Sequence, residues 1–269
     1  MLLVYRIDRL TRSIRGLLDI VDVLNDAGVG LVSASEHFDA NAALRGHLAG
    51  AGNHQCMDVT AATVRWDDPS MLAKVAVLAS HTGSNLRALH TAAQQPDTTF
   101  TIALIISNNR TSGALAYAQE HHIPHAHLSG RTHPEPAALD TAILQTLHQH
   151  QIDLLVTAGY MKKLGPATLA AYQGRILNIH PSLLPRHGGK GMYGMNVHQA
   201  VLAAGDTVSG ASVHLVTADY DAGPVIAQRQ VPVLVTDTPQ TLAARVLAAE
   251  HHLLPTVVRA MATRYARQE

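Results

Sequence analysis

From residue 74 onward, short apolar segments alternate with helix-like segments, and this alternation constrains the fold more than any other feature. Strands that alternate with helices through short connections form a mostly parallel, twisted sheet with right-handed crossovers. The predicted strands span residues 74–79, 100–107, 125–128, 152–158 and 175–180, and the predicted helices span 83–95, 112–122, 136–150 and 166–172. We therefore expect an α/β fold of Rossmann-like type, with helices on both faces of the sheet.

The last third of the chain follows a different pattern. After a predicted helix at 196–204, two strands at 211–217 and 225–235 are joined by a short turn, so we expect a mixed edge with antiparallel pairing. Thr238 suits the N-cap of a long final helix, and Pro239 suits its first position.

The first seventy residues do not continue the alternation. They contain a predicted helix at 13–27, a strand at 29–34 and a polar, turn-rich stretch at 49–70. The sequence thus predicts an N-terminal extension over residues 1–70 and one α/β domain over residues 71–269.

Composition excludes several classes of protein. Of the 269 residues, 47% are hydrophobic and 4% aromatic, which favours an aliphatic core of helices packed on a sheet. Lys plus Arg and Asp plus Glu number twenty each, so no net charge draws the chain to nucleic acid or a membrane. A single cysteine, Cys56, rules out an internal disulfide framework. With no signal peptide and no long apolar segment evident, we expect a cytoplasmic protein.

The densest group of histidines is His121, His122, His125 and His127. Pro124 interrupts any common helical face for these side chains. We interpret the group as a polar helix end that runs into a strand, and we assign no metal.

Gly83, Ser84 and Asn85 lie where the first strand of the alternation meets a helix. Free backbone amides at a helix N-terminus favour an anion, and glycine lets the backbone approach it closely. Serine and asparagine are also ordinary N-caps, so a phosphate site and a simple cap are both compatible with this segment.

A stronger pattern lies at the end of the strand at 175–180. Asn178 and His180 are two residues apart and share one face, at the carboxyl end of a strand where ligands of open α/β sheets bind. Asp221 follows in a turn. An amide and an imidazole can stabilise the charged tetrahedral intermediate of acyl transfer, while a carboxylate orients the imidazole and relays a proton. Each residue alone also fits a structural role, but the combination favours direct, non-covalent acyl transfer.

These motifs, with residues 178–185 the most specific, resemble the phosphoribosylglycinamide formyltransferases over residues 74–264. The resemblance implies transfer of a formyl group from 10-formyltetrahydrofolate to the amino group of glycinamide ribonucleotide in purine synthesis, by a monomer or homodimer without metal.

The resemblance also implies roles for individual residues. It assigns catalysis to Asn178, His180 and Asp221, phosphate binding to Gly83, Ser84 and Asn85, substrate binding to Glu250, the folate pocket to Met161, Lys162, Lys163 and Leu164, and a supporting role to His214. A helix-surface glutamate is the competing interpretation of Glu250. The family's substrate-contacting arginine has no aligned counterpart here, where the chain reads Gly-Arg-Thr-His-Pro over 130–134.

Two relatives of this fold are the nearest rivals. A formyltetrahydrofolate hydrolase would carry an N-terminal domain of this size, but residues 1–70 do not resemble it, and those enzymes read His-His-Ser where this chain has His-Pro-Ser at 180–182. A methionyl-tRNA formyltransferase would need an additional RNA-binding domain after the final helix.

Residues 4–39 resemble the middle of a serine-recombinase catalytic domain, with Asp8, Arg9 and Arg12 matching its active-site segment. The nucleophilic serine of that family lies upstream of this segment. We therefore expect a non-functional extension, and we expect a chain that begins at Met71 to be active. A DNA-binding recombinase fragment is the alternative function.

Overall fold

The computed structural model describes residues 2–4, 31–33 and 72–265. The strands are β1 (Leu2–Val4), β2 (Leu31–Ser33), β3 (Ala73–Leu78), β4 (Phe100–Ser107), β5 (His125–His127), β6 (Leu154–Thr157), β7 (Ile176–His180), β8 (Val208–Leu215) and β9 (Val225–Pro232). The helices are α4 (Ser84–Ala93), α5 (Gly113–Glu120), α6 (Pro136–Gln149), α7 (Pro166–Ala171), α8 (Met195–Ala203) and α9 (Pro239–Ala262). The predicted helix at 13–27, the stretch at 49–70, Asp8, Arg9, Arg12 and Cys56 lie outside the described residues.

Seven strands form one sheet in the order β5-β4-β3-β6-β7-β8-β9, and β1 pairs with β2 in parallel separately. The pairs among β3 to β7 are parallel, whereas β8 is antiparallel to both β7 and β9. The predicted α/β alternation and the mixed C-terminal edge are both confirmed. The chain enters β3 at Ala73, at the edge of the sheet opposite to the carboxyl ends of the parallel strands.

The last two strands are offset from their predicted bounds. β8 begins at Val208 rather than at 211, and β9 ends at Pro232 rather than at 235. The two strands pair Val208 with Pro232, so they terminate together. Beyond this pair, Asp237 accepts a hydrogen bond from the Leu234 amide, which bends the chain toward α9.

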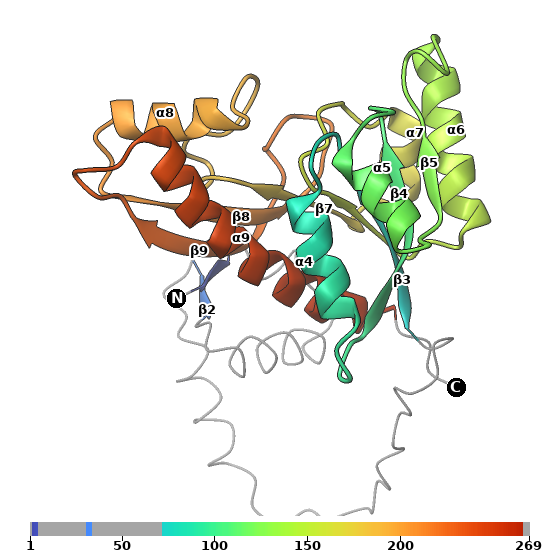
Figure 1. Ribbon diagram of the computed structural model, residues 1–269, viewed down its shortest axis with the longest axis horizontal. Coiled ribbons are helices and arrows are strands. Elements are labelled where there is room, and N and C mark those ends of the chain that lie inside the picture. The colour runs from blue at the N-terminus through green and yellow to red at the C-terminus, as the bar shows by residue number, and fades with distance from the viewer. Residues whose placement is uncertain (1, 5–30, 34–71, 266–269) are drawn as a thin grey trace, which may run out of the picture.

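Side chains of the central strand alternate between two apolar layers, as a strand buried on both faces requires. Val75 and Val77 of β3 join the layer built from α4, α5, α8 and α9, whereas Ala76 and Leu78 join the layer built from α6 and α7. In Figure 1, α4 and α9 cross in front of the sheet, with α6 and α7 to one side. None of the helices between residues 72 and 265 is both long and apolar enough to cross a bilayer.

Candidate active site

The neighbouring strands β6, β7 and β8 place polar side chains at the end of the sheet where the parallel strands have their carboxyl ends. Asn178 of β7 lies opposite Thr157 in the parallel strand β6 and opposite His214 in the antiparallel strand β8. Side chains directly opposite each other on adjacent strands are within contact distance. The strand order therefore brings three residues together that are far apart in the sequence.

Hydrogen bonds fix the Asn178 amide in one orientation. Thr157 Oγ1 donates to Asn178 Oδ1 over 2.8 Å, and Asn178 Nδ2 lies 2.9 Å from His214 Nε2. His214 Nδ1 lies 2.9 Å from the Leu215 carbonyl, which only accepts, so Nδ1 donates and Nε2 of the neutral ring accepts from Asn178. One Nδ2 hydrogen of Asn178 is then left for another acceptor.

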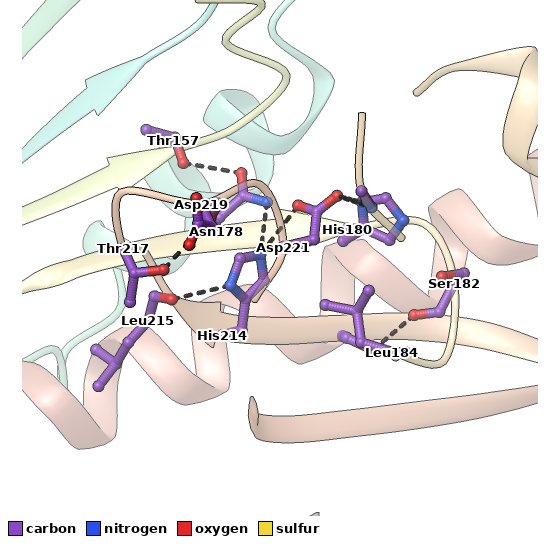
Figure 2. A network of polar contacts seen from close by, with 12 residues as sticks. Thr157, Asn178, His180, Ser182, Leu184, His214, Leu215, Thr217, Asp219 and Asp221 are labelled. Atoms are coloured by element: carbon purple, nitrogen blue, oxygen red, sulfur yellow. Dashed lines mark hydrogen bonds and ion pairs between the residues drawn. The ribbon is translucent and has the colours of Figure 1, made fainter. Parts of the chain in front are cut away.

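Asp221 joins the two histidines. Its Oδ2 lies 3.5 Å from His180 Nδ1, and its Oδ1 lies 3.4 Å from His214 Nε2. The Gly189 amide donates to Oδ2 over 2.9 Å. In Figure 2, Asn178, His214, Asp221 and His180 form one continuous polar network.

The backbone of Asp221 has φ +53°, a left-handed conformation that few residues other than glycine adopt, although aspartate tolerates it better than most. The turn therefore holds the carboxylate at a backbone cost, a feature that clusters at functional sites.

Burial and nearby charges shift the pKa values of His180 and Asp221. Burial lowers the pKa of His180, and the Asp221 carboxylate and the His187 carbonyl offset this only in part. Burial alone would raise the pKa of Asp221, but the close approach of His214, the hydrogen bond from the Gly189 amide and the charge of His180 hold it below its usual value. The carboxylate is therefore ionised at neutral pH.

The predicted phosphate loop begins α4. Gly83 is the N-cap, with φ +75° and no side-chain capping bond, so the simple serine or asparagine cap is wrong for this helix. A Cβ at Gly83 would lie 3.2 Å from Ala114 Cα, so glycine allows this conformation and the close approach of α5.

Asn85 turns inward rather than toward solvent. Its Nδ2 donates to Glu250 Oε2 of α9 over 2.6 Å, its Oδ1 has no partner within the described part of the chain, and the residue is 8% exposed. Glu250 is 7% exposed, so the interpretation as a helix-surface glutamate is wrong. Burial raises the pKa of Glu250, and the Asn85 amide opposes this shift.

The predicted folate segment links the phosphate loop to the Asp221 turn. The Met161 amide donates to Ser80 Oγ over 2.8 Å, just before the loop at 83–85. Lys163 Nζ lies 4.8 Å from the centre of the Tyr220 ring, next to Asp221. Leu164 is buried, while Lys162 is exposed.

The histidines at 121–127 are not part of this network. His125 and His127 line a surface cavity of about 420 Å³ between α5 and β5, together with Arg110. Between residues 72 and 265, no group of three or more His, Cys, Asp or Glu side chains is arranged to hold a metal ion. Arg131 belongs to the 130–134 segment, where no counterpart of the family's substrate-contacting arginine could be aligned, and it is exposed.

The structure adds Thr157 and the 187–189 loop to the predicted network. Thr157 lies in the predicted strand 152–158, but only the pairing of β6 with β7 makes it a neighbour of Asn178, and that pairing is not a local signal in the sequence. The loop contributes backbone groups of His187 and Gly189, which carry no signature in the sequence.

The fold is an open α/β sheet, and the network places an amide, a carboxylate and two imidazoles at the carboxyl ends of its parallel strands, the arrangement expected of an enzyme that uses acid–base groups. The nearby Ser182 and Ser212 hydroxyls donate to backbone carbonyls, which directs them away from the role of nucleophile.

Comparison with known proteins gives the family. Residues 73–258 match the family described as "Formyl transferase". A phosphoribosylglycinamide formyltransferase from Mycobacterium tuberculosis is 41% identical over 195 residues, covering 72% of this chain and 87% of that protein. The crystal structure of the Brucella melitensis phosphoribosylglycinamide formyltransferase has a TM-score of 0.66 and 41% identity, and the match covers 71% of this chain and 96% of that one. This chain belongs to the formyl transferase family, among the phosphoribosylglycinamide formyltransferases.

Two further comparisons concern length and the N-terminus. The chloroplastic phosphoribosylglycinamide formyltransferase of Vigna unguiculata is 41% identical over 189 residues, which cover 70% of this chain but only 60% of that protein. Residues 1–50 match the family described as "Resolvase, N terminal domain", in agreement with the resemblance of residues 4–39 to serine recombinases.

Proposed function

We propose that this protein transfers the formyl group of 10-formyltetrahydrofolate to the amino group of glycinamide ribonucleotide, a step of purine synthesis. The observation that carries the proposal is the network in which Asp221 lies between His180 and His214, with the Asn178 amide beside it. Relatives named phosphoribosylglycinamide formyltransferase support the choice of substrates.

In the first step, the amine nitrogen of the ribonucleotide attacks the formyl carbon bound to N10 of the folate. The carbon becomes tetrahedral, and its oxygen gains a negative charge. The free Nδ2 hydrogen of Asn178 stabilises this oxygen, and so does Nδ1 of His180, which donates when the ring is in its charged form. His180 Nδ1 lies 3.5 Å from Asp221 Oδ2, which is longer than a normal hydrogen bond. The proton on Nδ1 can therefore also be donated to the oxygen of the tetrahedral intermediate.

In the second step, the intermediate collapses. The attacking nitrogen loses a proton to the Asp221 carboxylate, the bond between the formyl carbon and N10 breaks, and N10 takes up a proton from the same relay. The products are the formamide and tetrahydrofolate, and the side chains return to their initial state.

We assign two flanking segments to the two substrates. The α4 N-terminus at 83–85 presents backbone amides suited to the phosphate of the ribonucleotide, with Glu250 buried behind it as a further polar partner. Residues 161–164 and the turn before Asp221 are joined by the Lys163–Tyr220 contact and form the walls proposed for the pterin.

The alternative is a formyltetrahydrofolate hydrolase, in which water replaces the amine. The structure of a formyltetrahydrofolate deformylase from Pseudomonas syringae matches with 27% identity and a TM-score of 0.64, below the identity of the transferases named above. The chain also has Pro181 where those enzymes carry a second histidine.

We further propose that residues 71–269 form the transferase domain, that residues 1–70 are a non-functional extension, and that the protein acts in the cytoplasm as a monomer or homodimer.

The deciding experiment follows the folate spectroscopically with and without glycinamide ribonucleotide. Turnover that requires the ribonucleotide supports the transferase. Equal turnover in its absence would establish the hydrolase instead, and no turnover under either condition would contradict both.

A further inference from the structure

A second polar chain reaches His180 from the side opposite to Asp221. His180 Nε2 lies 2.8 Å from the carbonyl oxygen of His187. A carbonyl accepts and never donates, so Nε2 must carry a hydrogen in the neutral and in the charged ring. All gain and loss of a proton by His180 then takes place at Nδ1, the nitrogen that faces Asp221.

The carbonyl of His187 is itself held by its own side chain. His187 has φ +52°, in the left-handed region that a histidine seldom adopts. Its Nε2 lies 2.7 Å from Asp206 Oδ2, and both side chains are largely buried. Asp206 belongs to the turn between α8 and β8, and its backbone amide is bonded to Val201 of α8.

The same loop also holds Asp221, the partner of His180, because the Gly189 amide donates a hydrogen bond to Asp221 Oδ2. Gly188 lies between His187 and Gly189, and a Cβ there would lie 2.4 Å from Leu184 Cδ2, so the Leu184 side chain would have to move. A loop that is fixed at His187 therefore fixes both His180 and Asp221.

We propose that Asp206 and His187 are positioning residues that select the ring tautomer of His180. The Asp206–His187 hydrogen bond holds the loop so that the His187 carbonyl captures the Nε2 hydrogen, which leaves Nδ1 as the working nitrogen. Neither residue needs to touch the substrates. The expected effect on kcat rests on the proposed formyl transfer, whereas the preference of His180 for one tautomer does not depend on that function.

The test measures the ring ¹⁵N shifts of neutral His180 by NMR, with His180→Gln to identify its signals, alongside kcat and both KM values. In the unaltered protein, neutral His180 is expected in the Nε2–H form. Asp206→Ala should introduce the Nδ1–H form and lower kcat on the order of tenfold or more, with both KM values within about twofold.

Two matched variants distinguish the positioning role of Asp206 from the effect of its charge and from the effect of its contact with Arg186. Asp206→Asn keeps an acceptor for His187 and should restore the tautomer and most of kcat. Arg186→Ala removes the other, exposed partner of Asp206 and should leave both readouts unchanged. If Asp206→Ala does not fold, His187→Asn breaks the same bond, since asparagine tolerates the left-handed backbone and is shorter.

An unchanged Nε2–H tautomer in Asp206→Ala or His187→Asn would overturn the proposal, as would a loss in Asp206→Asn or Arg186→Ala equal to that in Asp206→Ala. If the unaltered protein transfers no formyl group, the proposed function fails, and the tautomer shift still decides whether Asp206 positions His180.

Discussion

Asn85 Nδ2 and Glu250 Oε2 lie 2.6 Å apart, and both residues are more than nine-tenths buried although 165 positions separate them in the sequence. This contact ties the N-terminus of α4 to the middle of α9. The proposed phosphate loop is thus held by a long-range polar pair and not by a cap within its own helix.

Glu250→Gln tests both the binding role and the burial of this carboxyl group. Loss of the charge should raise KM for glycinamide ribonucleotide about tenfold or more, while kcat changes little, if Glu250 binds the substrate away from the reacting atoms as proposed. Steady-state kinetics with the folate at saturation measure this. A change confined to kcat would contradict the assignment.

The same variant has a pH-dependent effect on stability. Because burial raises the pKa of Glu250, the folded state binds a proton more tightly than the unfolded state, so ionisation costs stability as pH rises above about 4.3. Each unit of raised pKa corresponds to about 1.4 kcal/mol. Glu250→Gln should therefore be more stable than the unaltered protein at pH 7, and the difference should shrink toward pH 4 in urea titrations.

Substitutions in the network at the strand ends should abolish activity without unfolding the protein. Asp221→Asn keeps the shape but removes the charge, and His180→Ala removes the imidazole, so each should lower kcat by about two to four orders of magnitude. Circular dichroism should show retained secondary structure. Near-normal turnover in either variant would exclude the proposed roles.

His180 should also affect stability at mildly acidic pH. Its pKa is lowered by burial, so as the pH falls below about 6.5 the unfolded chain takes up the proton before the folded one, and stability is lost. His180→Gln lacks this group. Between pH 7 and pH 5 the free energy of unfolding should therefore fall less in the variant than in the unaltered protein; an equal fall would show that this histidine titrates normally.

Asp140 should stabilise the helix that follows the folate segment. From α6 it accepts hydrogen bonds from the backbone amides of Ala167 and Thr168 at the start of α7, over 2.7 and 3.1 Å. This is the role of a capping side chain, supplied by another helix. Asp140→Ala should lower stability by about 1–2 kcal/mol in thermal unfolding. Asp140→Asn, which keeps one acceptor, should lose less.

A chain that begins at Met71 should remain soluble and keep its activity, because the family match begins at residue 73 and every strand of the seven-stranded sheet lies beyond it. Formyl transfer by both chains is the measurement. Loss of activity on truncation would assign a role to residues 1–70. DNA binding by the full chain that weakens steeply with salt would favour the recombinase alternative.

The elements of the α/β domain could be predicted from the sequence because their signals are local. An apolar run such as 100–107 and a Thr-Pro pair at 238–239 specify a strand and a helix start without reference to the rest of the chain. The lateral strand order is not local, and it alone makes His214 and Thr157 neighbours of Asn178. The inward orientation of Asn85 depends on tertiary packing against Glu250, which no local sequence pattern predicts. The contact with His180 is made by the backbone carbonyl of His187, so it does not depend on a recognisable residue type.

The position at which the chain enters β3 determines where a further polypeptide can be joined to this domain. Ala73 starts a central strand, whereas Thr157 and Asn178 of the polar network lie toward the carboxyl ends of their parallel strands. A polypeptide joined at Ala73 is therefore attached at the opposite end of the strands from this network. This end of the domain is thus the natural place to join a purification tag, a surface anchor or a partner enzyme.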